Sequence, residues 1–289
     1  MQRRTLVTLM LLAVVAAAFF VPLDSEAVRI HDAALERSVG AFAIAKGLNA
    51  VISLLQGTEF SATPAGVGIT FTVGEILDPM NDMVERFSWI MLASSVSLGV
   101  QKLLLSVGEI TWIKLLLGGV GGVLLASVWH PPLQRRLPVG VLLRLAVVLL
   151  VLRFGAMGFV HTGNLIYDSL MRSQYDASVA LLHGTQSELD AIAAQSRREA
   201  EVKEEGLLDT LSGSYDRMKR FFDVEARIAG LKAGLEKAQM EMLHLITIFV
   251  TLNLLLPLLF LWISLNLLRW AVVGRFDGDA VREWLNAGQ

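Results

Sequence analysis

The last long apolar segment of the chain keeps one helical stripe while its other faces change character. Between Phe221 and Leu256 apolar residues recur at alternating spacings of three and four, which is the pattern of a coiled-coil seam. The other positions before His244 are rich in charged side chains, whereas no residue from Leu245 to Leu268 is ionisable. The pattern therefore predicts one helix, from Tyr215 to Trp270, that begins in water and ends across a bilayer.

Three further segments are apolar enough to cross a hydrocarbon layer of about 30 Å. They are Thr5–Val21, Ile110–Trp129 and Val139–Val160. The second of these carries closely spaced glycines, which predict a flat surface for a neighbouring helix, at Gly118, Gly119, Gly121 and Gly122.

Basic residues determine how many segments we expect to cross, because cytoplasmic loops are enriched in Arg and Lys. If each of the four apolar segments crosses once, all the basic segments lie in the cytoplasm. They are Arg3 and Arg4, Arg135 and Arg136, and the basic C-terminal tail. Counting residues 87–105 as a further crossing would put Arg135 and Arg136 outside. That segment also contains several polar side chains, so we interpret it as a re-entrant or interfacial helix.

The sequence thus predicts an all-α integral membrane protein with four transmembrane helices, one marginal re-entrant or interfacial helix and a long exterior antiparallel coiled-coil hairpin. The predicted segments are a signal anchor or signal peptide at 1–22, an exterior helical region at 23–109 that includes the helix 87–105, a transmembrane hairpin at 110–160 with a cytoplasmic turn at 130–138, the exterior coiled-coil hairpin at 161–243, a transmembrane helix at 244–270 and a cytoplasmic tail at 271–289.

Within the first exterior region, Arg29–Gln56 has the pattern of an amphipathic helix. The glycine-rich stretch that follows predicts an irregular loop, although Ile69–Val73 alternates like a short strand. Asp78 followed by Pro79 is typical of a helix start, with a carboxylate N-cap and a proline at the first helical position.

The predicted exterior hairpin begins after a break at His161–Asn164, and its first helix runs to about Glu204. The apolar stripe of that helix is interrupted by Gln186 and Ser196, and its members are Tyr175, Val179, Leu182, Leu189 and Ala193. The stripes of the two helices either satisfy only each other, or the second stripe also faces another chain or the Arg29–Gln56 helix.

Composition places the chain among membrane proteins. It is 54% hydrophobic and 18% charged, with a mean hydropathy of +0.57. The net charge of −2 gives no basic surface for nucleic acid, and zero cysteines exclude disulfides and thiolate chemistry. No catalytic or nucleotide-binding motif is present. We therefore expect neither enzymatic activity nor a cofactor.

Two groups of polar residues are the candidates for specific chemistry. Glu241 and His244 have the Glu-x-x-His spacing of di-iron bundles, but in a single copy, and His161 is expected at the same outer membrane surface. These three are weak candidates for a metal site, because interfacial histidines commonly bond to headgroups or water.

The second group lies within the expected spans. Arg153 is costly in hydrocarbon unless it is paired or wet, and Asn253 lies at a similar expected depth. We predict an Arg153–Asn253 hydrogen bond; the alternatives are a polar path formed by Arg153, Lys114 and Glu109, or an arginine that snorkels outward. Pro257 is expected to kink or loosen the last span.

These patterns favour a non-catalytic scaffold, assembly or sensor subunit of a bacterial-type inner membrane. Its exterior hairpin would bind other membrane or periplasmic proteins or a second copy of the chain. The alternative is an oligomeric channel or transporter that uses the intramembrane charges and the helix 87–105.

Overall fold

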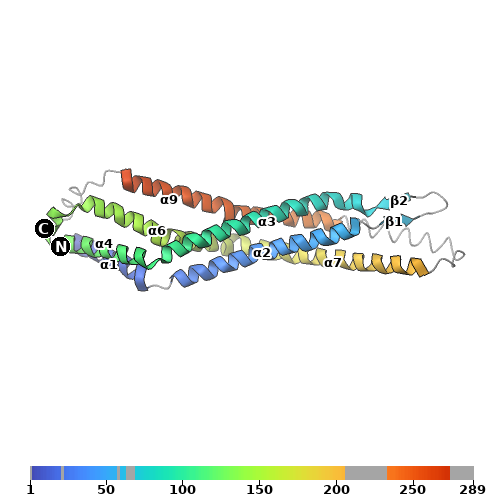
Figure 1. The fold of residues 1–289 in the computed structure, drawn as a ribbon, viewed down its shortest axis with the longest axis horizontal. Coiled ribbons are helices and arrows are strands. Elements are labelled where there is room, and N and C mark those ends of the chain that lie inside the picture. Colours follow the sequence, from blue (N-terminus) through green and yellow to red (C-terminus); the bar gives the residue numbers. More distant parts are fainter. Residues whose placement is uncertain (1, 21–22, 57–58, 63–68, 206–232, 274–289) are drawn as a thin grey trace. The chain divides into compact units, whose positions relative to one another are not determined.

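The computed structural model describes residues 2–20, 23–56, 59–62, 69–205 and 233–273, and these residues are predominantly helical (Figure 1). The α-helices are α1 (Gln2–Phe20), α2 (Leu23–Gln56), α3 (Val73–Glu109), α4 (Thr111–Trp129), α5 (Pro131–Arg136), α6 (Val139–Ile166), α7 (Arg172–Glu205) and α9 (Leu256–Val273). Residues 233–250 are also helical, and two π-helices interrupt the longer helices, η1 (Tyr167–Met171) and η2 (Thr251–Leu255).

The chain divides into two compact units. Unit 1 consists of Met1–Leu35, Val96–Tyr167 and Leu252–Gln289, and unit 2 consists of Glu36–Ser95 and Asp168–Thr251. The dividing positions fall inside α2, at Ser95 in α3, and within both π-helices.

Six helices of the described part are long and apolar enough to cross a membrane, by length and composition. This confirms the expectation of several long apolar helices and indicates a membrane protein. Four of the six contain the predicted spans, and the other two are α2 and α3. The number of crossings stays a prediction, because α2 and α3 also use their apolar residues to pack within the protein.

That use is a pair of narrow buried seams with a coiled-coil repeat. On α2 the fully buried positions follow spacings of three and four, and they are Ser38, Ala41, Ala45, Leu48, Ile52 and Leu55. On α3 the same repeat is unbroken, and its buried members are Leu77, Met80, Val84, Phe87, Met91, Ser94, Leu98, Gln101 and Leu105. The sequence predicted the amphipathic α2 but not the seam on α3.

Two contacts give the direction of the α2–α3 pair in unit 2. Gln56 Nε2 donates to Asp78 Oδ1 at 3.0 Å, and Ser38 Oγ donates to the Met91 carbonyl at 3.3 Å. Positions on α3 advance as those on α2 recede, so the helices are antiparallel in this unit (Figure 1). In unit 1, His31 Nε2 lies 2.8 Å from the carbonyl oxygen of Leu98.

The connection between α2 and α3 corrects two predictions. Instead of an entirely irregular loop, Glu59–Ala62 (β1) pairs antiparallel with Ile69–Thr72 (β2). The helix starts at Val73 rather than at Asp78–Pro79, so Pro79 lies inside α3. Asp78 does not cap this start, because its position is five residues beyond Val73 and its carboxylate accepts the bond from Gln56.

The predicted break at His161–Asn164 is also wrong. Helix α6 continues through these residues to Ile166 and passes by way of η1 directly into α7. A Cβ at Gly163 would make an ordinary contact with the Leu256 side chain, at 3.6 Å. Thr162 Oγ1 donates back to the Gly158 carbonyl at 2.8 Å and does not cap a new helix.

The second long pair of helices, in unit 2, buries the predicted stripes in part. On residues 233–250 the buried stripe members are Leu235, Ala238, Met242, Leu245 and Phe249, and on α7 the buried residues are Ser178, Leu182, Thr185, Leu189 and Ala193. The predicted stripe of the later helix is thus confirmed from Leu235 to Phe249, whereas Leu252 and Leu256 are only half-buried and its beginning in 215–232 lies outside the described residues. On α7 the predicted members Tyr175 and Val179 are half-buried, and Ser178 and Thr185 are buried instead. Helix α7 also contacts α2, because Gln186 lies against Gly47.

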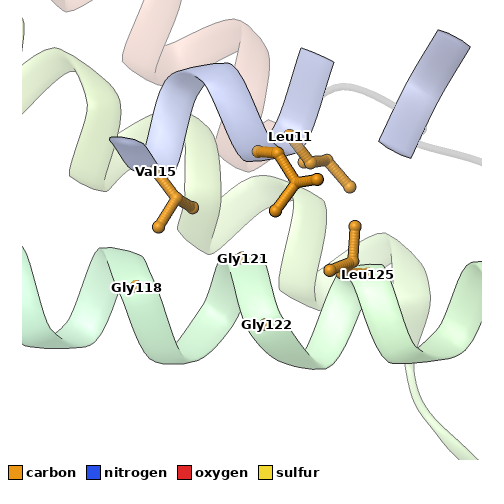
Figure 2. A pocket seen from close by; sticks show the side chains of 7 residues that line it. Leu11, Val15, Gly118, Gly121, Gly122 and Leu125 are labelled. Carbon is orange, nitrogen blue, oxygen red and sulfur yellow. The ribbon is translucent and has the colours of Figure 1, made fainter. Parts of the chain in front are cut away.

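In unit 1, α1 packs closely on the glycines of α4. A Cβ at Gly118 would meet the Phe19 ring at 2.9 Å, and one at Gly121 would meet the Val15 side chain at 2.7 Å. This confirms close packing at two of the four predicted glycines, whereas Gly119 and Gly122 have no such neighbour within 4 Å. A small apolar cavity of about 70 Å³ lies between α1 and α4 (Figure 2).

Gly108 near the end of α3 allows this helix to approach the backbone of α6. A Cβ there would lie 3.1 Å from the Arg153 carbonyl oxygen and 3.2 Å from that of Leu152, whereas a Cβ at Gly99 would meet nothing within 4 Å. Backbone atoms cannot rotate away as a long side chain can. The two glycines of one helix therefore form a matched pair.

We expect Gly108→Val to destabilise the purified protein by about 1–3 kcal/mol through overpacking. Gly99→Val serves as the control and should cost less, because its side chain enters open space. Thermal unfolding in detergent, followed by circular dichroism, measures the difference. Equal melting temperatures for the two variants would show that α3 does not approach α6 as closely as described.

Candidate functional site

Asn253 lies in the π-helix η2 and is buried, with only 6% of its surface exposed. In an α-helix the carbonyl of residue 253 would accept the backbone N–H of residue 257, but residue 257 is proline and has no N–H. The sequence therefore deprives one buried carbonyl of its usual donor. The predicted loosening of the last span at Pro257 is confirmed by the π-helix at this point.

Two side chains of α3 satisfy the Asn253 carbonyl. Ser97 Oγ donates to it at 2.5 Å, and Gln101 Nε2 donates to it at 3.4 Å and to Ser97 Oγ at 3.2 Å. Gln101 is itself buried, with 8% exposed. A buried carbonyl without a donor costs about 1–3 kcal/mol, so these bonds hold α3 against the last helix.

Arg153 has a comparable partner on α1. Its Nη2 donates to the Ala18 carbonyl at 3.2 Å, and its guanidinium carbon lies 5.2 Å from the centre of the Phe154 ring. The Ala18 carbonyl lies in the last turn of α1, and Pro22, four residues further on, has no N–H to give it. The guanidinium thus bonds to a backbone carbonyl of α1, and not to Asn253 as the sequence predicted. With 3% of the residue exposed, it does not snorkel.

The residues of the predicted polar path lie on three helices of unit 1. Glu109 is exposed at the C-terminal end of α3, Lys114 is half-buried in the first turn of α4, and Arg153 is buried on α6. The close approach of Gly108 brings the end of α3 to the backbone of Arg153. A continuous path through these groups stays a prediction.

A further polar contact joins α2 to α3 in unit 1. Lys102 Nζ and Asp32 Oδ1 form an ion pair at 2.6 Å, and both side chains are about half exposed. The neighbouring His31 is buried and bonds to the Leu98 carbonyl through Nε2. Sequence reasoning missed this group, although Asp32, His31 and Lys102 are polar positions beside the two apolar seams.

In unit 2, Glu241 is the centre of a polar cluster between α7 and residues 233–250. Its Oε2 accepts a hydrogen bond from Ser178 Oγ at 2.6 Å and from Gln174 Nε2 at 3.3 Å, and lies 3.1 Å from His244 Nδ1. The Ser178 hydroxyl, followed by the bond to His244, lowers the pKa of Glu241 against the opposing effect of burial.

The ring of His244 has one nitrogen in this cluster. Nδ1 lies 3.0 Å from Gln174 Nε2 as well as 3.1 Å from Glu241 Oε2, and 43% of the side chain is exposed. Protonation at Nδ1 turns it into a donor to the carboxylate. Gln174 and Ser178 of α7 therefore join the Glu241–His244 pair to a second helix.

The three weak metal candidates have separate first partners. His161 Nδ1 lies 3.0 Å from the Met157 carbonyl of its own helix, whereas Glu241 and His244 share the cluster above. Within the described residues, no three His, Asp or Glu side chains form a group suited to hold a metal ion. This geometry does not support a metal site at His161, Glu241 and His244.

No family model, curated protein or solved structure matches this chain. The contacts within the chain are therefore the basis for its functional interpretation.

If the Asn253 carbonyl depends on α3, the double variant Ser97→Ala/Gln101→Leu should lose about 1–3 kcal/mol of stability. Adding Pro257→Ala restores an N–H at residue 257 and should recover much of that loss, whereas Pro257→Ala in the wild-type background should change little. Thermal unfolding of the four proteins in one detergent measures this coupling. A triple variant no more stable than the double variant would contradict the account.

The Glu241 cluster predicts a pH dependence. Because the pKa of Glu241 is lower in the folded protein than in the unfolded chain, ionised Glu241 stabilises the fold above its ordinary pKa of about 4.3, and this contribution is lost as the pH falls through the folded pKa. Glu241→Gln should therefore lower the melting temperature at pH 7 and differ less from wild type at pH 3. Glu236→Gln, at an exposed position of the same helix, is the matched control. A deficit that is the same at both pH values would refute the role of the ionised carboxylate.

Proposed function

We propose that the chain is a non-catalytic scaffold, assembly or sensor subunit of a bacterial-type inner membrane. It crosses the membrane four times, at about residues 5–21, 110–129, 139–160 and 245–268, and presents antiparallel helical hairpins outside. Coiled-coil hairpins on membrane helices are suited to bind partner proteins and to transmit movement.

Contacts within unit 1 support four crossings. Trp129 Nε1 donates to Thr8 Oγ1 at 3.0 Å, and Gly118 lies at the Phe19 ring, so α1 and α4 are antiparallel. Gly155 approaches the Phe260 ring and Gly163 the Leu256 side chain, so α6 and α9 are antiparallel as well. Only Ile110 separates α3 from α4, so no loop connects these two helices.

The observation that carries the proposal is the use of polar side chains to join helices. Ser97 and Gln101 donate hydrogen bonds to the Asn253 carbonyl. Arg153 donates to the Ala18 carbonyl, and Ser178 donates to the Glu241 carboxylate. Each of these bonds links two helices that are distant in sequence. Such bonds suit a protein that fixes the register of long helices for a partner, whereas a transport path needs polar groups directed toward a solute or water.

The test uses the full chain, whose lack of cysteine permits single labels. Ser187→Cys and Arg136→Cys are both exposed positions, and an impermeant maleimide on intact cells should label the first and leave the second protected. A photo-crosslinking residue at His183 in cells should then give discrete higher-mass products, whereas one at the lipid-facing Leu265 should give none.

The channel alternative has its own readout. Purified protein in liposomes should give no ion flux above empty liposomes. A flux that Arg153→Leu abolishes would overturn the scaffold proposal in favour of an oligomeric channel. Labelling at Arg136→Cys with protection at Ser187→Cys would overturn the orientation.

A further inference from the structure

Helix α3 has a broad exposed apolar face opposite its buried seam. The exposed fractions of its large members are 41% for Leu92, 60% for Val96, 54% for Val100, 68% for Leu103, 53% for Leu104 and 38% for Val107. Gly99 lies on the same face with nothing within 4 Å of its Cβ position. The described chain covers these side chains only in part.

The width of this face distinguishes between two kinds of occupant. At about 100° per residue, the exposed apolar positions from Leu92 to Val107 cover an arc of about 140°, whereas the buried seam from Ser94 to Gly108 covers about 80°. A partner helix in a coiled coil needs only a narrow seam. A broad face fits a surface that surrounds the helix, and lipid is such a surface.

Apart from the buried Ser94 hydroxyl, which has no hydrogen-bond partner among the described residues, the polar side chains of the same segment are paired. Ser106 is exposed, yet its Oγ donates to the Lys102 carbonyl at 3.0 Å, and Ser95 Oγ donates to the Met91 carbonyl at 2.9 Å. Ser97 donates to Asn253, and the ammonium group of Lys102 pairs with Asp32. Hydroxyls that turn back to their own helix are typical where water is scarce.

The apolar face also continues into α4. Beyond Ile110, which is 44% exposed, the exposed residues are Trp112 at 73%, Leu115 at 49% and Leu116 at 55%. At its other end the face begins at Trp89, which is 65% exposed and lies on the same side of α3. Tryptophan is enriched where a membrane meets water.

We infer that the face of α3 from Val96 to Val107 is a lipid-binding surface that lies in the outer leaflet of the bilayer. The inference rests on the membrane orientation of the proposed function and adds a partner to it. This face of α3 contacts acyl chains directly, so the lipid of the outer leaflet is itself a ligand of this helix.

The test uses three single-cysteine variants of the full chain in liposomes of phosphatidylethanolamine and phosphatidylglycerol. Leu103→Cys reports on the proposed face, Leu116→Cys on α4 as the lipid reference, and Val39→Cys, which replaces a half-exposed residue of α2, as the water reference. Each variant carries a nitroxide spin label. Power saturation then compares its accessibility to oxygen, which partitions into lipid, and to a water-soluble nickel chelate.

The label at Leu103→Cys should resemble that at Leu116→Cys, with oxygen favoured over nickel, and the order should reverse at Val39→Cys. A label at Leu103→Cys that nickel reaches as readily as at Val39→Cys overturns the inference. Low accessibility to both reagents together with spin–spin broadening between labels also overturns it, because a second copy would then cover the face. The labels at Leu116→Cys and Val39→Cys separate these results from a failure of the proposed orientation, which would alter the references themselves.

Discussion

The narrow buried side of α3 is the constraint on which the other helices depend. One seam of this helix packs against α2, while Ser97 and the seam residue Gln101 donate hydrogen bonds to the carbonyl of Asn253, and Gly108 near its end admits the backbone of α6. Large residues occur on both sides of α3, such as Phe87 and Met91 in the buried seam and Leu103 on the exposed face. The contacts with the other helices therefore depend on single positions, where a short polar group or a glycine lets the neighbour approach.

The bond to Asn253 also illustrates a general requirement of apolar surroundings. A proline removes the donor for the carbonyl four residues before it, and the chain places prolines so that Ala18 and Asn253 lose theirs. Both carbonyls are then covered by side chains from other helices, Arg153 in one case and the Ser97–Gln101 pair in the other. Because of the prolines, these two carbonyls accept hydrogen bonds from other helices. The interior carbonyls of a regular helix are already paired within their own helix.

The sequence predicted those features that depend on one segment. The stripe of 233–250, the span Thr111–Trp129 and the loosening at Pro257 follow from local periodicity and from the missing N–H of proline. The seam of α3 escaped notice because Ser94 and Gln101 occupy seam positions and resemble exposed polar residues. The sequence paired Arg153 with Asn253 only because the two residues have a similar expected depth in the membrane. That depth gives no information about the Ala18 carbonyl on α1, which is the partner in the structure.

Two glycines show a further limit of local sequence. The sequence predicted a break at His161–Asn164, but α6 continues past Gly163, where a Cβ would make only an ordinary contact, at 3.6 Å, with the Leu256 side chain. At Gly108, by contrast, a Cβ would lie 3.1 Å from the Arg153 carbonyl oxygen. Local sequence alone does not separate a glycine that ends a helix from one that admits a neighbouring helix.

A regular heptad seam does not by itself fix the register of two packed helices, because an apolar seam packs almost equally well when it is shifted by seven residues. Polar pairs within the seams remove this freedom. Ser38 must meet Ser95 and the Met91 carbonyl, and Ser178 must meet Glu241. A shift of α7 by seven residues would put Leu181 in the place of Gln174 in one direction, or Met171 in the place of Ser178 in the other, so the partly buried Glu241 carboxylate would lose one of its donors. The polar cluster at Glu241 thus specifies one alignment of the second hairpin, and its partner groups on α7 are what a change of register would have to break.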